Sequence, residues 1–176
     1  VSVAGWVLQY VASSGSAQTI NVLPAGASVP ARGFFLITSR VVSNGYTGTT
    51  TPDFVALTGA GAPKTLSLGN AGGAVRLGLP GATSSTPVSD PLWSDKAGWG
   101  TSTHGEGTST PAGGWGSSAP YVGASLERKA SASSTEASMS GGEANAGNGR
   151  DTQDNATDFV PRAMRQPQNT SSTPEP

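Results

Sequence analysis

Short apolar or alternating runs, separated by glycine, proline, asparagine and serine, make up most of this chain, and helical periodicity is almost absent. Apolar residues at every second position are typical of half-buried β-strands, and many such runs with turn residues between them indicate an all-β sandwich or barrel. The expected strands are residues 6–12, 18–23, 33–39, 64–69, 74–79, 95–101 and 124–130, with a last short strand within 157–161. This number of strands is sufficient for two sheets.

The alternation also predicts which side chains form the core. Trp6, Leu8 and Tyr10 fall on one face of their strand, because side chains of a strand alternate between its two faces. The same spacing pairs Leu66 with Leu68 and Val75 with Leu77, and residues 69–73 (GNAGG) suit a tight hairpin between these two strands. The expected core residues are Trp6, Leu8, Tyr10, Leu66, Leu68, Val75, Leu77 and Phe159.

The pattern divides the chain into one domain and a tail. Residues 1–165 hold all the expected strands, whereas 166–176 are rich in proline, serine and threonine and are expected to form a tail or linker. Two stretches within the domain, 101–120 and 131–149, are rich in glycine, serine and threonine and are expected to be long loops.

Composition excludes several classes of function. The 176 residues are 35% hydrophobic and carry a formal net charge of -1, so a modest core is expected and nucleic acid is excluded as a partner of this chain alone. There is no cysteine, which removes disulfides, thiolate metal sites and cysteine nucleophiles. No apolar run approaches the roughly 20 residues that a membrane span needs, so membrane insertion is not expected. The chain begins without Met and without a basic leader, which indicates a processed product or a piece of a longer protein.

Several motifs, taken in order, resemble one family. They are VSVAGWVLQY, VPARGFFLI, LSLGNAGGAVRL, DKAGWGT, SLERKA, DTQDNATDFV and PQNTSS, which together cover roughly Val1 to Ser171. This series resembles the bacterial version of the lamin-tail domain. The resemblance implies an immunoglobulin-like β-sandwich of secreted and surface proteins, used as a binding or structural module, with Trp6 and Leu8 in the core.

The chain departs from the family at its start. Family members carry another strand before the segment that matches Trp6, and this chain begins too late to contain it. A sandwich without that strand exposes unpaired backbone groups at a sheet edge. Either the strand lies on an upstream segment outside this chain, or a neighbouring subunit supplies it by strand addition. Self-association or a neighbouring protein chain is therefore the expected partner.

A cluster of acidic and amide residues lies near the end of the domain. Asp151, Asp154, Asn155 and Asp158 are separated by three, one and three positions, and their oxygen atoms suit Ca²⁺, although the spacing is not that of an EF-hand. Asp and Asn also cap backbone N–H groups in turns, and Arg150 can neutralise one of them. The favoured interpretation is a polar clasp that closes the sandwich, with Ca²⁺ as the alternative.

The remaining candidates give no catalytic constellation. His104, the only histidine, lies in a glycine-rich loop beside Glu106, and a solvated loop histidine is favoured over a metal ligand or a base. Trp99 is expected to pack inward, whereas Trp93 and Trp115 are equally suited to cover the sheet edges or to form a flat platform for a sugar ring. Residues 155–157 and 169–171 match the N-glycosylation pattern, which carries little weight in a bacterial protein.

These observations predict a non-catalytic extracellular module without a cofactor, joined to its neighbours by strand complementation as a subunit of a surface filament or another polymer. The alternatives are an accessory domain of a larger secreted nuclease or phosphatase and a carbohydrate-binding module.

Overall fold

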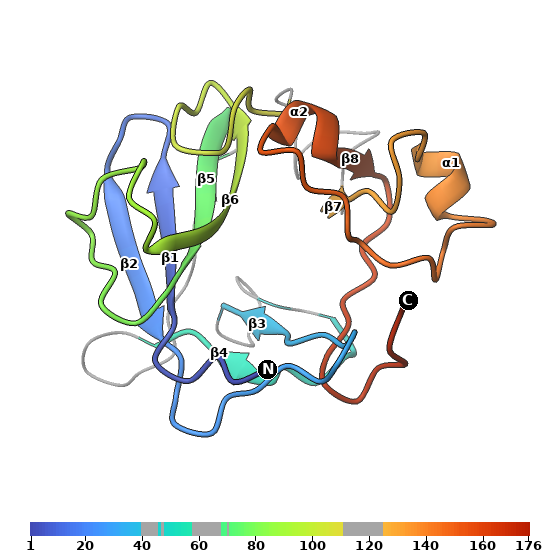
Figure 1. Ribbon diagram of the computed structural model, residues 1–176, viewed down its shortest axis with the longest axis horizontal. Helices are drawn as coiled ribbons and strands as arrows, with labels where there is room; N and C mark the ends of the chain where they lie inside the picture. Colours follow the sequence, from blue (N-terminus) through green and yellow to red (C-terminus); the bar gives the residue numbers. More distant parts are fainter. Residues whose placement is uncertain (40–45, 47, 58–67, 70, 111–124) are drawn as a thin grey trace.

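The computed structural model describes residues 1–39, 46, 48–57, 68–69, 71–110 and 125–176. Most regular elements in these residues are strands, and the two helices are short (Figure 1). No helix among them is long and apolar enough to cross a membrane. The elements are β1 (Val7–Ala12), β2 (Ala17–Val22), β3 (Ile37–Thr38), β4 (Phe54–Val55), β5 (Gly72–Gly78), β6 (Trp93–Gly100), β7 (Ser125–Arg128), α1 (Glu136–Met139), α2 (Asn155–Asp158) and β8 (Phe159–Arg162).

The largest sheet has four strands in the order β2-β1-β5-β6, and each neighbouring pair is antiparallel. Val11 of β1 lies opposite Ala17 of β2 on one side and opposite Ala74 of β5 on the other. Strand β1 is therefore an inner strand, and both of its edges are paired within the chain. The expectation of an open edge beside Trp6 to Tyr10 is thus corrected, because the hairpin partner β2 takes that place.

Both faces of β1 are covered, which the alternating pattern did not predict. Tyr10 is buried on one face, while Val7, Gln9 and Val11 are buried on the other. Gln9 is fully buried beside Arg76, its register partner on β5, which donates a hydrogen bond to Gln9 Oε1 at 3.4 Å, whereas Gln9 Nε2 has no hydrogen-bond partner among the described residues. The sheet thus contributes side chains to packing on each side.

The face that carries Tyr10 forms the main core. The rings of Tyr10 and Trp99 are stacked with their centroids 6.1 Å apart, and Trp99 Nε1 donates to the Gly69 carbonyl at 2.8 Å. Leu126 of β7 packs against this pair from outside the sheet, as does the fully buried Ala56, which follows β4. Leu126 and Ala56 therefore help to cover this face, and the long aromatic side chains fill the space beneath them.

The smaller elements differ in part from the expected ones. Strand β3 is much shorter than the predicted 33–39, and it pairs in parallel with β4, which the pattern did not indicate. Strands β7 and β8 form an antiparallel pair. Helix α1 interrupts the expected loop 131–149, and it begins where the Thr135 hydroxyl accepts the N–H of Ser138, which satisfies a free donor of the first turn.

Several expected core residues lie elsewhere. Leu68 is 50% exposed and lies outside every described strand, so its assignment to the core is corrected. Leu66 lies outside the described residues. Trp6 packs with Val3 and Leu23 in a separate cluster, because it precedes β1 and the chain turns there at Gly5.

The other expected core residues pack against the main sheet or one another. Leu8 and Val75 pack against the Tyr10–Trp99 pair, and Leu77 is half-buried. Phe159 is also half-buried, and the guanidinium of Arg128 lies over its ring, 4.6 Å from the centroid. Strands β7 and β8 are thus joined by a cation–π contact as well as by their ladder.

The C-terminal segment, residues 166–176, lies against the domain. Thr50 Oγ1 donates to the Pro167 carbonyl at 3.0 Å, and Asn169 Nδ2 donates to the Thr51 carbonyl at 2.9 Å. The N–H of Glu175 donates to the Arg32 carbonyl at 2.9 Å. Own-chain contacts therefore hold a segment whose composition is typical of a linker.

Candidate functional site

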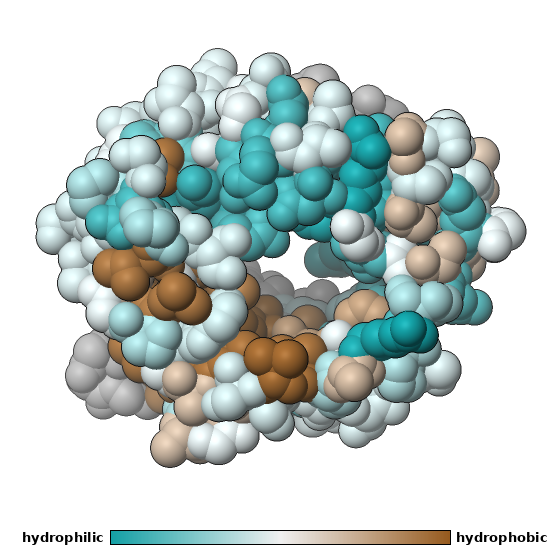
Figure 2. Space-filling model, viewed as in Figure 1, coloured by the Kyte–Doolittle hydropathy of each residue, from teal (hydrophilic) through white to brown (hydrophobic). Residues whose placement is uncertain are grey.

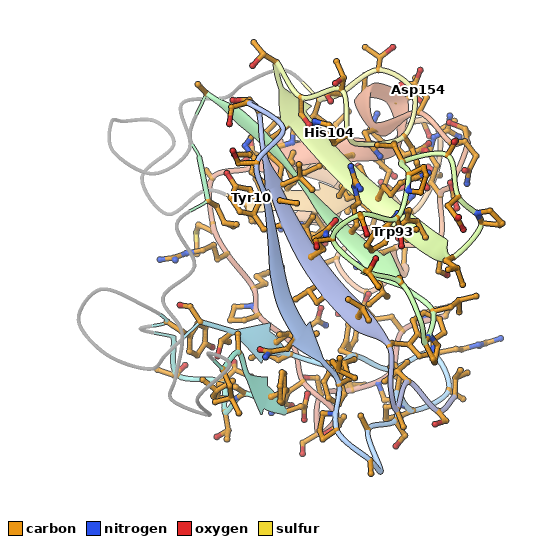
Figure 3. The ribbon with its side chains drawn as sticks, turned by 90° about the vertical axis from the view of Figure 1, so that its left-hand side faces the viewer. Tyr10, Trp93, His104 and Asp154 are labelled. Carbon is orange, nitrogen blue, oxygen red and sulfur yellow. The ribbon has the colours of Figure 1, made fainter. Side chains whose placement is uncertain are left out.

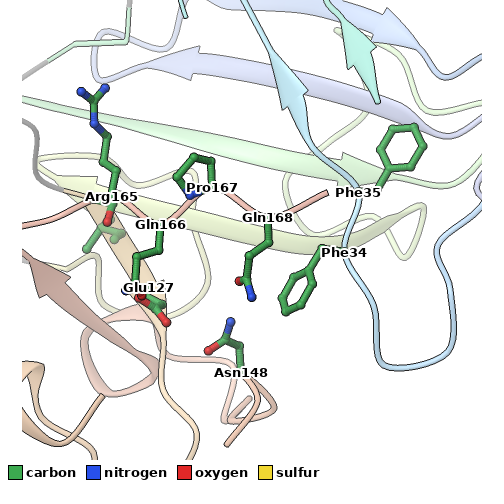
Figure 4. Close-up of a pocket in the computed structure, with 10 residues that line it drawn as sticks. Phe34, Phe35, Glu127, Asn148, Arg165, Gln166, Pro167 and Gln168 are labelled. Atoms are coloured by element: carbon green, nitrogen blue, oxygen red, sulfur yellow. The ribbon is translucent and has the colours of Figure 1, made fainter. Parts of the chain in front are cut away.

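A pocket of about 360 Å³ lies between the segment before β3, strand β7 and the start of the C-terminal segment. Figure 2 shows the molecule hollowed near the middle of one face, and Figure 4 shows the side chains around the pocket. This volume falls within the range of roughly 300–1,000 Å³ that small-ligand sites occupy. The pocket is lined by Phe34, Phe35, Ser125, Leu126, Glu127, Asn148, Arg165, Gln166, Pro167 and Gln168.

Polar groups of this pocket are held in place by the chain. Arg162 is paired with the Glu127 carboxylate through one nitrogen and donates to Gln166 Oε1 at 3.3 Å through the other. Burial raises the pKa of the Glu127 carboxyl above its ordinary value, and the Arg162 guanidinium opposes that rise. The amide nitrogen of Asn148 is placed to donate to the carbonyls of Gly147 and Arg128. Fixed polar groups beside apolar rings are the composition of a binding site.

The acidic cluster predicted from the sequence is a turn that includes α2, and we call residues 150–158 the polar clasp. Asp154 caps α2 by accepting the N–H of Ala156 at 3.0 Å. Asp151 accepts the N–H of Gln153 at 3.1 Å, and Gln153 has a positive φ of 61°. Short acidic side chains thus satisfy the N–H groups of a tight turn. In Figure 3, Asp154 and His104 lie toward the end of the molecule opposite β3 and β4.

Asn155 joins the polar clasp to the edge of the main sheet. Its Oδ1 accepts the N–H groups of Gly98 and Glu106 at 2.7 and 2.9 Å, and its Nδ2 donates to the Lys96 carbonyl at 2.8 Å. Asn155 is fully buried, so the glycosylation pattern at this position is closed to sugar in the folded protein. Its side chain occupies the place that a further strand would take beside β6.

Asp158 is the charged centre of the polar clasp. Its carboxylate accepts the N–H and the hydroxyl of Thr152, both at 2.7 Å, and lies 3.5 Å from Arg150 Nε. Burial alone would raise the pKa of the Asp158 carboxyl, but the bonds from Thr152, the N–H of Asp154 and the charge of Arg128 lower it below its ordinary value. The carboxylate is therefore kept ionised by its neighbours.

The geometry of the polar clasp gives no support to the Ca²⁺ alternative. The oxygens of Asp154, Asn155 and Asp158 accept hydrogen bonds from the chain itself. Within the residues that the structure describes, no group of three or more His, Cys, Asp or Glu is arranged to hold a metal ion. The polar clasp acts as a closing element of the fold.

Arg76 and His104 form a second polar region, on the face of the main sheet opposite Tyr10. Arg76 is 4% exposed, its Nε donates to the His104 carbonyl at 3.2 Å, and its guanidinium lies 5.2 Å from the Trp93 ring centroid. Burial and, secondarily, the charge of Arg76 lower the pKa of the His104 imidazole. Burial raises the pKa of the Glu106 carboxyl, with Asp95 and Asp151 adding to the rise. The neutral form of the His104 imidazole is thus favoured, and the Glu106 carboxyl ionises at a higher pH than an ordinary glutamate.

Of the two alternatives left open for Trp93, the exposed platform is not present. Its side chain is 5% exposed, and its Nε1 donates to the Pro87 carbonyl at 3.0 Å. The platform assignment for Trp93 is therefore corrected, because Arg76 and Val7 cover the ring on the buried face. Trp115 lies outside the described residues.

Sequence reasoning did not find the pocket, and it also missed the structural role of Arg76. One signal for the pocket was present, namely the adjacent aromatic residues Phe34 and Phe35, both of which line it. The other lining residues come from segments far apart in the sequence, so no local pattern joins them.

No protein-family model, curated protein or solved structure matches this chain.

Proposed function

We propose that this protein is a non-catalytic extracellular binding module, built on an immunoglobulin-like sandwich of the lamin-tail type, that holds a partner in the pocket beside β7. The observation that carries the proposal is the pocket itself, in which apolar rings lie next to polar groups fixed by the chain. Preformed sites of this composition favour binding, because the polar groups need little reordering when a ligand arrives.

The packing of the two layers supports the fold assignment. Leu126 of β7 and the buried Ala56 contact the face of the main sheet that carries Tyr10 and Trp99. Two sheets that enclose a core between their inner faces are the architecture of a sandwich. The resemblance of the sequence motifs to lamin-tail domains supports the same assignment and the extracellular location.

The use of the charged side chains in β7, β8 and the polar clasp supports a role without chemistry. Arg128 is paired with Asp95 at 2.6 Å and also lies near Asp151 and Asp158, and Arg162 is paired with Glu127. Asp158 and Asn155 are occupied by backbone N–H groups. Groups committed in this way stabilise the fold, whereas a catalytic base must be free to take a proton from a substrate.

The proposal is tested by NMR on the full chain. Small compounds of several classes, namely monosaccharides, short peptides, nucleosides and aromatic acids, are titrated while the backbone and side-chain amide signals are followed. We expect at least one class to shift the signals of residues 125–127 and 166–168 and to stay chemically unchanged. If the shifts are confined to other regions of the chain, the proposal of binding in this pocket is wrong. If a bound compound is converted, the non-catalytic part of the proposal is wrong.

Assembly through a sheet edge is the second candidate, and the position of β2 favours it. Strand β2 is the last strand of its sheet among the described residues, and Val22 at its end is 60% exposed. Exposed edge strands are templates for pairing with another chain, and a lysine there blocks such pairing. We expect self-association that increases with concentration in analytical ultracentrifugation and is lost in Val22→Lys. A wild-type chain that sediments as a monomer at every concentration removes this candidate.

A further inference from the structure

The pocket has one aromatic wall that the core does not use. Phe35 packs against the buried cluster of Val3, Leu23 and Ala27. Phe34 belongs to none of the buried clusters of the described residues, is half-buried, and lines the pocket (Figure 4). A ring that is held beside a cavity without serving the core presents its surface to whatever occupies the cavity.

The opposite wall carries the side-chain amides of Gln166 and Gln168, and each amide makes one hydrogen bond within the chain. Gln166 accepts from Arg162 through its Oε1 at 3.3 Å, and Gln168 donates to Glu175 through its Nε2 at 2.7 Å. Within the described part of the chain, Gln166 Nε2 and Gln168 Oε1 have no hydrogen-bond partner. One donor, on the exposed Gln166, and one acceptor, on the half-buried Gln168, are thus left for a ligand, and Figure 4 shows the Gln168 amide reaching toward Phe34 and Asn148.

The carboxylate of the lining is already paired, and the arginine of the lining, Arg165, is exposed. Glu127 is paired with Arg162, which is itself 3% exposed, and the Arg165 side chain points away from the other labelled residues (Figure 4). A carboxylate that is already paired offers little attraction to a cation, and an exposed arginine that stays in water holds an anion only weakly. The pocket therefore suits a neutral ligand.

We infer that the pocket binds the neutral ring of a sugar, with the C–H face of the ring against Phe34 and its hydroxyl groups on Gln166 and Gln168. A pyranose has an apolar face whose C–H groups carry partial positive charge, which complements the negative face of an aromatic ring. Its hydroxyl groups both donate and accept, which matches one free amide donor and one free amide acceptor. The inference rests on the proposed binding function and names its class of ligand.

The test uses glucose, galactose, mannose and N-acetylglucosamine as probes on the isotopically labelled full chain. We expect at least one of them to shift the side-chain amide signals of Gln166 and Gln168, with saturation transfer to the C–H protons of the ring. Glucuronate and glucose 6-phosphate serve as charged comparators and are expected to bind more weakly. Phe34→Ala is expected to weaken binding about tenfold, as truncation of an aromatic contact does.

Control variants separate binding from folding. Met164→Ala removes a 73% exposed apolar side chain from the same segment without touching the pocket, and its affinity should equal that of the wild type. If Phe34→Ala does not fold, Phe34→Leu keeps most of the volume, removes the aromatic face and should still lose affinity. A Phe34→Leu chain that binds the sugars like the wild type overturns the ring-stacking part of the inference.

The outcomes distinguish the ligand class from the binding function. If sugars leave Gln166 and Gln168 unchanged while a short peptide shifts them, the sugar inference is wrong and the binding proposal stands. If no probe of any class shifts the pocket signals, both fail. Sugar shifts that persist unchanged in Phe34→Ala and in Gln166→Ala place the sugar elsewhere and overturn the inference.

Discussion

Asn155 connects three segments of the chain through a single amide. It accepts from Gly98 of β6 and from Glu106 of the following loop, and it donates to Lys96. Each of these backbone groups would otherwise lack a partner in a buried place, which costs about 1–3 kcal/mol per group. The residue is therefore a structural link between the polar clasp and the main sheet.

Asn155→Ala is expected to lower the free energy of unfolding by about 3 kcal/mol or more, because three backbone groups lose their partner at once. Urea denaturation followed by fluorescence measures this change. Ser133→Ala, at an exposed position, should stay within about 0.5 kcal/mol of the wild type. A loss at Asn155 no larger than that of Ser133→Ala would contradict the linking role.

Asp158→Asn is expected to destabilise the protein by about 2 kcal/mol at neutral pH, because the ionised carboxylate accepts strong hydrogen bonds from Thr152. The pKa of the folded-state carboxyl is lowered, so the wild type binds this proton less tightly when folded than when unfolded. The stabilisation is thus present above the unfolded value of about 3.9 and is lost as the pH falls through the lower folded value. Denaturation curves at several pH values should show the two proteins converging only in strong acid.

Strand β5 depends on small residues where aromatic side chains cross it. A Cβ at Gly73 would lie 2.7 Å from Tyr10 Cε2 and 2.9 Å from Trp99 Cζ2, closer than packed atoms come. The glycine leaves room for the stacked pair that forms the main core, so this strand is glycine-rich because of packing and not because it turns.

Gly73→Ala is expected to cost about 1–3 kcal/mol, because Tyr10 and Trp99 must move apart to admit the methyl group. Near-ultraviolet circular dichroism reports the rearrangement of the two rings directly. The matched control is Gly142→Ala, where a Cβ would meet nothing within 4 Å and the stability should be nearly unchanged. Equal effects of the two alanines would mean that the stacked pair does not need the space at Gly73.

At the scale of the whole molecule, the C-terminal segment is hydrogen-bonded to residues that lie far away in the sequence. Thr170 donates from its N–H and its hydroxyl to Asp53, and the same carboxylate accepts the N–H of Leu36 at 2.7 Å. Asp53 therefore joins the C-terminal segment to the segment before β3, and Gln166 and Gln168 of the pocket lining lie two to four residues before Thr170. The tail contributes to the shape of the pocket.

Thr170→Val is expected to speed hydrogen exchange of the amides in residues 168–175, since the segment loses a hydroxyl bond to Asp53 worth about 1 kcal/mol. Exchange in β1 and β5 should not change, because their ladders are independent of the tail. Thr173→Val makes the same chemical change at an exposed position and should leave the exchange rates as they are. If the exchange rates of these amides in Thr170→Val equal those of the wild type, the C-terminal segment is held by its other contacts.

The sequence alone determined the mainly β character, the location of most strands of the main sheet and the turn-forming nature of residues 150–158. These properties depend on alternation and on local hydrogen bonding, which neighbouring residues decide between themselves. Only the tertiary structure decided that β1 is an inner strand, that Trp93 is buried under Arg76 and that Leu68 faces solvent. The pocket belongs to the second group, because its walls come from residues 34–35, 125–127, 148 and 165–168, which long-range folding brings together and which no local pattern encodes.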